Sequence, residues 1–164
     1  MFRRITISIL ISLLLWSCQQ RNFSSPESLV RYYVGLINSG DRGKFRKSLM
    51  TKTEYVNEVF PETVDSKGGL TGTEFWEQFI ALQRINAMEK YFQIFDGCRL
   101  EVLSVQPAKE ILSEGRFRFH KRIRVNLASL CRGKPKEYLE DQALFGIVIE
   151  KPNGTFSLMN VARD

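Results

Sequence analysis

The stretch RFRFHKRIRVNL, residues 116–127, decides the fold. Apolar and polar side chains alternate along it, which is the period of a strand with one covered face. The residues that point one way are Phe117, Phe119, Ile123, Val125 and Leu127, and those that point the other way are Arg116, Arg118, His120, Arg122 and Arg124. Just before it, Glu114-Gly115 predicts a two-residue hairpin turn in which Ser113 faces Arg116. The pattern therefore predicts an antiparallel sheet.

Three other segments after residue 97 have strand character. Residues 99–106 alternate, and Pro107 marks a bulge or bend at which the alternation changes face. Residues 138–150 contain a nearly continuous apolar run, which predicts a central strand covered on both faces. A turn at Lys151-Pro152-Asn153-Gly154 leads into a last strand at 155–161. We expect a sheet of about four strands.

The chain before residue 97 has the apolar spacing of helices instead. Ser25 is a predicted N-cap and Gly40 a predicted helix end, while Asp41 and Thr73 are predicted to cap later helices. The spacing predicts helices over 26–39, 42–50, 51–60 and 73–95, with a loop over 61–72. The expected fold class is α+β, with N-terminal helices packed on an antiparallel sheet.

The opening helix resembles that of a known family. Ser25-Pro26-Glu27, with Val30 and Tyr33, and then Ile37-Asn38-Ser39-Gly40-Asp41, are similar to the first helix and turn of NTF2-like (cystatin-like) proteins. The resemblance implies a strongly curved sheet wrapped around a long helix into a cone, often with an apolar pocket at its mouth. It gives no residue-by-residue match to the family's enzymes. Another α+β sandwich is the alternative.

The N-terminus has the pattern of an export signal. Arg3 and Arg4 precede an apolar run over 5–16, which is too short for a stable membrane span of roughly 20 residues. Leu15-Trp16-Ser17-Cys18 resembles the lipobox of bacterial lipoproteins, although Trp16 departs from the usual small residue. An ordinary secretory signal with a chance cysteine and an uncleaved anchor are the alternatives.

The lipobox implies a lipid-anchored protein. It divides the chain into a signal peptide at 1–17, a tether at 18–24 that begins with a palmitate-type acylated Cys18, and a single domain at 25–164. Acyl chains on Cys18 would hold the protein to membrane lipid in the cell envelope. Gln19 replaces the aspartate that retains some lipoproteins in the inner membrane, so the outer membrane is favoured.

Charge and cysteine content limit the function. The formal net charge of +6 falls to +4 without Arg3 and Arg4, which is too little to predict nucleic-acid binding. An exported chain with two further cysteines, Cys98 and Cys131, invites a disulfide, and the hairpin register places them opposite each other. Two separate buried thiols are the alternative.

No catalytic or metal-binding motif is present, and no cofactor is expected. The single histidine, His120, is interpreted as solvated or packed across strands rather than as a general base, and it cannot complete a zinc site with two paired cysteines. Arg116, Arg118, Arg122 and Arg124 form either a solvated, ion-paired face or a site for an acidic protein or lipid headgroups. The abundant aromatic residues form either core or an apolar ligand pocket.

These observations favour a membrane-anchored lipoprotein whose exported domain is a non-enzymatic binding or interaction module. The alternative is an NTF2-like domain that binds or converts a small ligand. An enclosed apolar pocket that contains His120 or a buried carboxylate would favour the enzyme. A filled core with a charged, convex outer sheet would favour the interaction module.

Overall fold

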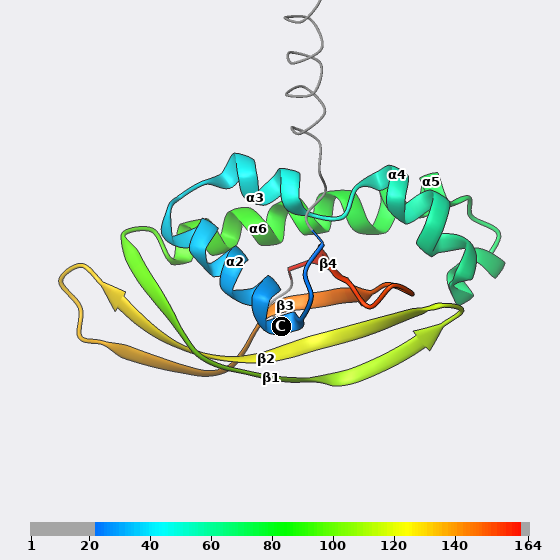
Figure 1. Ribbon diagram of the computed structural model, residues 1–164. Coiled ribbons are helices and arrows are strands. Elements are labelled where there is room, and N and C mark those ends of the chain that lie inside the picture. Colours follow the sequence, from blue (N-terminus) through cyan, green and yellow to red (C-terminus); the bar gives the residue numbers. More distant parts are fainter. Residues whose placement is uncertain (1–21, 162–164) are drawn as a thin grey trace, which may run out of the picture.

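The computed structural model describes residues 22–161, which form an α+β fold (Figure 1). The helices lie together on one side of a curved antiparallel sheet. The main helices are α2 (Pro26–Asn38), α3 (Arg42–Ser48), α4 (Lys52–Glu54), α5 (Gly72–Phe75) and α6 (Leu82–Ile94). The strands are β1 (Cys98–Glu114), β2 (Phe117–Cys131), β3 (Glu137–Glu150) and β4 (Phe156–Asn160), in that order across the sheet.

Two core clusters fill the space between the helices and the sheet. The first joins α2, Phe45 of α3 and Phe92 of α6 to the strands. The second joins residues 50–60 and 75–81 to strand positions that include Phe117 and Ile149. Within β3, the adjacent residues Val148 and Ile149 are both fully buried, so the prediction of a central strand covered on both faces is confirmed.

The helices begin at side-chain caps. Ser25 caps α2 as predicted, in a reciprocal pair of hydrogen bonds with Ser28. The predicted cap at Thr73 is wrong, because Thr71 forms the capping box with Glu74 and the helix begins at Gly72. The predicted helices over 51–60 and 73–95 are each interrupted by a π-helical segment, at Tyr55–Val59 and Trp76–Ala81. Among the described residues, no helix is long and apolar enough to span a bilayer.

The hairpin between β1 and β2 turns one residue later than predicted. Glu114 pairs with Phe117 across a turn of Gly115 and Arg116, so the predicted Glu114-Gly115 turn is wrong. Gly115 has a φ of 53°, and two-residue type II′ turns carry glycine with positive φ at this position. A Cβ on Gly115 would also overlap the carboxylate of Glu62, which approaches the turn from the helical layer.

Two bulges on β1 restore the predicted pairing of the cysteines. One extra residue is inserted near Leu103 and another near Pro107, where a bulge was predicted. Together they cancel the two-place shift in pairing that the later turn produces. Cys98 therefore faces Cys131, and the two residues form a disulfide.

The alternation of β2 breaks at Arg122, whose φ of 56° is left-handed. Phe119 and Ile123 were predicted to share one face, but they belong to the second and the first core cluster respectively. His120 and Ile123, predicted on opposite faces, line the same pocket. The break changes which side chains reach each face of the sheet.

The predicted tether at 18–24 is too long. Phe23 is 9% exposed, and its backbone pairs with Phe156 at the start of β4. One aromatic side chain within a polar segment therefore fixes the chain to the core from residue 22 or 23 onward. Every member of both core clusters lies between Phe23 and Val161. A chain that begins at residue 18 thus retains every core residue that the structure describes.

A pocket beneath the first helix

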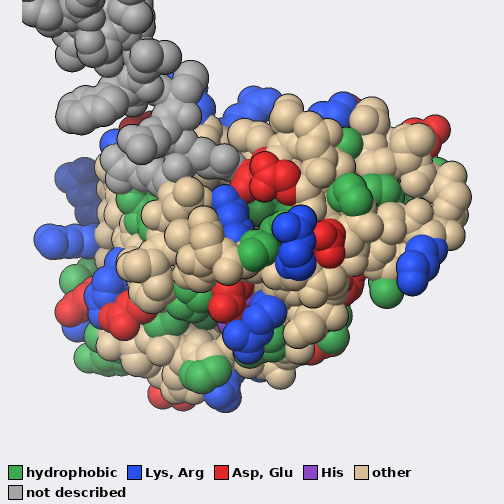
Figure 2. All heavy atoms as spheres, turned by 45° about the vertical axis from the view of Figure 1, so that its right-hand side comes forward, with side chains coloured by type: hydrophobic (Ala, Val, Ile, Leu, Met, Phe, Trp, Pro, Cys, Tyr) green, Lys and Arg blue, Asp and Glu red, His purple; other side chains and the backbone are tan. Residues whose placement is uncertain are grey.

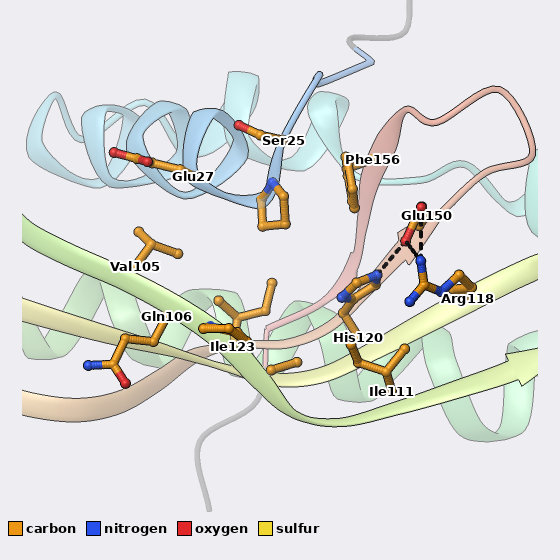
Figure 3. A pocket seen from close by; sticks show the side chains of 13 residues that line it. Ser25, Glu27, Val105, Gln106, Ile111, Arg118, His120, Ile123, Glu150 and Phe156 are labelled. Carbon is orange, nitrogen blue, oxygen red and sulfur yellow. Dashed lines mark hydrogen bonds and ion pairs between the residues drawn. The ribbon is translucent and has the colours of Figure 1, made fainter.

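A pocket of about 470 Å³ lies between the N-terminus of α2 and the sheet. Its volume is in the range of small-molecule sites. Figure 3 shows the side chains of α2, β1, β2, Glu150 and Phe156 around it. The lining residues are Ser25, Pro26, Glu27, Val105, Gln106, Pro107, Ala108, Ile111, Arg118, His120, Ile123, Glu150 and Phe156.

Local backbone features create this pocket. The bulge near Pro107 bends β1 where it passes under Pro26, and the left-handed Arg122 brings His120 and Ile123 to the same side of β2. Bulges bend a strand and redirect its side chains, which is why they recur beside binding sites. The capped N-terminus of α2 closes the opposite wall.

Three polar side chains meet at one end of the pocket. His120 Nε2 lies 2.7 Å from Glu150 Oε2, and Arg118 Nη1 lies 3.2 Å from the same oxygen (Figure 3). The side chains of His120 and Glu150 are 10% and 20% exposed, whereas that of Arg118 is 52% exposed. The carboxylate therefore orients both donors, and Arg118 extends from the pocket to solvent.

The other walls are mostly apolar. Val105, Pro107, Ala108 and Ile123 contribute apolar surface, and the Phe156 ring meets the His120 ring edge-on at 5.6 Å. Figure 3 shows Val105 and Ile123 on the side of the pocket away from Glu150. One site thus combines an apolar region with a polar end that holds a carboxylate, a guanidinium and an imidazole.

The structure brings only part of the predicted arginine face to this site. Arg118 lines the pocket, and Arg124 Nε lies 3.5 Å from the carbonyl of Pro107. Arg116 lies in the turn, where its guanidinium donates to Glu62 at 2.8 Å and holds the pKa of that carboxyl below its usual range. Because Arg122 interrupts the extended backbone, the prediction that these arginines share one face of a regular strand is wrong.

The prediction that His120 packs across strands is confirmed by its contacts with Glu150 and Phe156. Sequence reasoning missed Glu150 as its partner, because the two residues lie 30 positions apart. Sequence reasoning also did not predict that the N-terminus of α2 forms one wall of the pocket. The aromatic residues divide between the two roles considered: Phe117, Phe119 and Phe145 are buried in core, and Phe156 lines the pocket.

The pocket contains His120 beside a carboxylate, the combination expected above for an enzyme, whereas its lining offers few nucleophiles. Among the described lining residues, Ser25 carries the one nucleophilic hydroxyl, and its Oγ already accepts from the backbone N–H of Ser28. A carboxylate-bound imidazole is an arrangement seen in general bases, so proton transfer is chemically possible at His120. No group of three or more metal-ligating side chains occurs among the residues that the structure describes.

The fold and this site define an α+β domain with a ligand-sized pocket at the N-terminus of its first helix. The predicted lipobox and its Cys18 lie outside the described residues. Comparisons with protein-family models, with curated proteins and with solved structures find no match to the chain.

Proposed function

We propose that this protein is a lipid-anchored binding protein of the cell envelope. Its domain takes a small ligand with an apolar body and a hydrogen-bond-accepting end. The observation that carries the proposal is the pocket, with apolar walls and the Arg118–Glu150–His120 group at one end. The resemblance of residues 25–41 to NTF2-like proteins supports it, because apolar pockets are common in that family.

The polar end sets the expected ligand chemistry. Guanidinium carries five N–H donors and no acceptor, and Glu150 engages only one nitrogen of Arg118 in the contacts described. The remaining donors can bind a carboxylate, sulfonate or carbonyl oxygen of a ligand. The apolar body would then contact Val105, Ala108 and Ile123.

An enzymatic domain is the second candidate, and the His120–Glu150 pair is the observation that favours it. His120→Asn removes the base but retains a polar side chain in the pocket. Binding of the probe described next is expected to change little in this variant. If the His120→Asn variant still bound the ligand but no longer converted it chemically, the enzyme would be favoured instead.

Filling the pocket is expected to weaken ligand binding strongly. In Ala108→Trp the indole would occupy the apolar half of the site, so the affinity for anilinonaphthalene sulfonate should fall by about tenfold or more, which corresponds to ~1.4 kcal/mol. The measurement is a fluorescence titration of the chain that begins at residue 18.

Lys109→Trp is the matched control, since it adds the same indole at an exposed neighbouring position outside the pocket. Its affinity should equal that of the unmodified chain. Equal probe affinity in Ala108→Trp, with an unchanged unfolding midpoint, would contradict ligand binding at this site.

The anchor is tested separately by metabolic labelling with a fatty-acid analogue. Wild-type protein should incorporate the label and sediment with membranes, and Cys18→Ala should lose the label completely, because that cysteine is the proposed acylation site. Cys98 and Cys131 are joined to each other and offer no free thiol, so they cannot account for label on the wild-type chain. Equal labelling of Cys18→Ala and wild type would remove the lipid anchor from the proposal.

A further inference from the structure

Helix α3 presents a basic surface on the helical side of the domain. Phe45 is its one fully buried side chain, packed edge-on against Tyr33 and Phe92 with ring centroids 4.7 and 5.5 Å away. Since helical residues lie about 100° apart, burial of Phe45 directs Lys44 and Arg46 to the flanks and Lys47 to the outer side. All three are exposed.

This surface carries more positive charge than its neighbours neutralise. Arg42 pairs with Glu89 and Lys52 pairs with Glu77, but among the described residues Lys44, Arg46 and Lys47 form no ion pair. Asp41, which caps α3, offsets one of these charges.

A buried cation beneath the same surface adds to the excess. Arg84 is 7% exposed and donates to the carbonyl of Met50, just after α3, with its guanidinium over the Trp76 ring. Burial lowers the pKa of Arg84 to about 10, so this group stays cationic at neutral pH. No described carboxylate pairs with it.

The described chain starts next to this basic surface. The Phe23 ring lies 5.2 Å from that of Tyr32, whose hydroxyl is 2.9 Å from Ser48 Oγ at the end of α3. Asn22 is bonded to Lys151, which pairs with Glu54 of α4. Figure 1 shows this start on the helical side of the sheet, between α3 and α4.

An acylated Cys18 would hold the start of the domain at a short distance from the bilayer. Three residues, 19–21, separate Cys18 from Asn22, so four Cα–Cα steps join them. Even fully extended they span at most roughly 14 Å. A lipid anchor at Cys18 therefore keeps the start of the domain, and α3 beside it, close to the headgroups.

We propose that α3 docks the domain on anionic lipid headgroups through Lys44, Arg46 and Lys47. This orientation rests on the lipid anchor proposed above. Long basic side chains reach headgroup phosphates from both flanks and the outer side of a short helix. Figure 2 shows Lys and Arg side chains along the upper and left edges of that view, and the face toward the reader mixes hydrophobic side chains with basic and acidic ones. The membrane-facing surface is thus on the helical layer and not on the arginines of β2.

Vesicle co-sedimentation of the chain that begins at residue 18, with Cys18→Ser to prevent acylation, tests the docking surface without the anchor. The chain should bind phosphatidylcholine vesicles that contain phosphatidylglycerol, lose binding at high ionic strength, and bind pure phosphatidylcholine poorly. Lys44→Glu/Arg46→Glu/Lys47→Glu should reduce partitioning on the order of 100-fold, since each basic residue near an anionic surface contributes about fivefold.

The matched control reverses three exposed basic residues on the sheet and its far loop, Lys109→Glu/Arg132→Glu/Lys134→Glu. It changes net charge equally and should lose far less affinity. Equal losses in both variants, binding to neutral vesicles, or no binding by the parent chain would each overturn the docking surface. Fatty-acid labelling of Cys18 is independent of these results, so failure of the anchor and failure of the docking surface are distinguishable.

Discussion

Replacing Phe45 with alanine is expected to lower the free energy of unfolding by about 3–5 kcal/mol, the usual cost of removing a buried aromatic side chain. Phe45 has no exposed surface and contacts both Tyr33 of α2 and Phe92 of α6. Those two helices meet the sheet through the first core cluster. The vacated space would therefore lie at the junction of three helices, where the surrounding chain cannot easily collapse.

Phe79→Ala is the matched control, because Phe79 is an aromatic residue of the same helical layer but is 46% exposed. The Phe79 ring lies 5.1 Å from the Phe75 ring, but nearly half of the residue is already exposed to solvent. We therefore expect its removal to lower the free energy of unfolding by less than about 1 kcal/mol. Urea unfolding followed by circular dichroism measures both. Similar losses in the two variants would show that Phe45 does not hold α3 to the core.

Local patterns in the sequence were enough to predict the fold class. The apolar run in β3 predicted a strand covered on both faces, and the complete burial of the adjacent Val148 and Ile149 confirms it. The Ser25 cap and the start of α2 were also predicted, because N-capping depends on residues within one turn. These features are decided by neighbours in the sequence.

The register of the hairpin was not a local property. Glu114-Gly115 and Gly115-Arg116 are both plausible turns from the sequence. The approach of Glu62 to Gly115 is one contact that distinguishes the turn that forms from the one that does not. Two bulges, of which only the one near Pro107 had a sequence signal, then compensated for the error. The pairing of Cys98 with Cys131 was predicted correctly from a register that was wrong at the turn.

The candidate site could be predicted only in part. The strand pattern placed Arg118 and His120 on one face, and both line the pocket. The partner carboxylate Glu150 comes from β3, and the opposite wall comes from α2, near Pro26. Contacts between segments this distant depend on the curvature of the sheet and on the left-handed backbone at Arg122, which no periodicity in the sequence indicates.

Removing the disulfide is expected to cost about 3–4 kcal/mol of unfolding free energy. The bond closes a loop of 33 residues, and in the chain-entropy model the stabilisation grows slowly with loop length. The variant is Cys98→Ala/Cys131→Ala in a chain that carries Cys18→Ser. The reduced parent chain should unfold at the same urea concentration as the double variant, while the oxidised parent should unfold at a higher one.

The position of the disulfide also predicts where in the hairpin amide hydrogen exchange will accelerate. β1 is an edge strand, and its hairpin with β2 is closed at one end by the turn at Gly115 and at the other by the disulfide. Loss of the bond should therefore speed amide hydrogen exchange near the Leu100–Ser129 pair, which lies beside the disulfide. Exchange near the Leu112–Phe119 pair, which lies beside the turn, should change less. Two free thiols in the unreduced, unfolded parent chain, or uniform acceleration along the hairpin, would contradict this role for the disulfide.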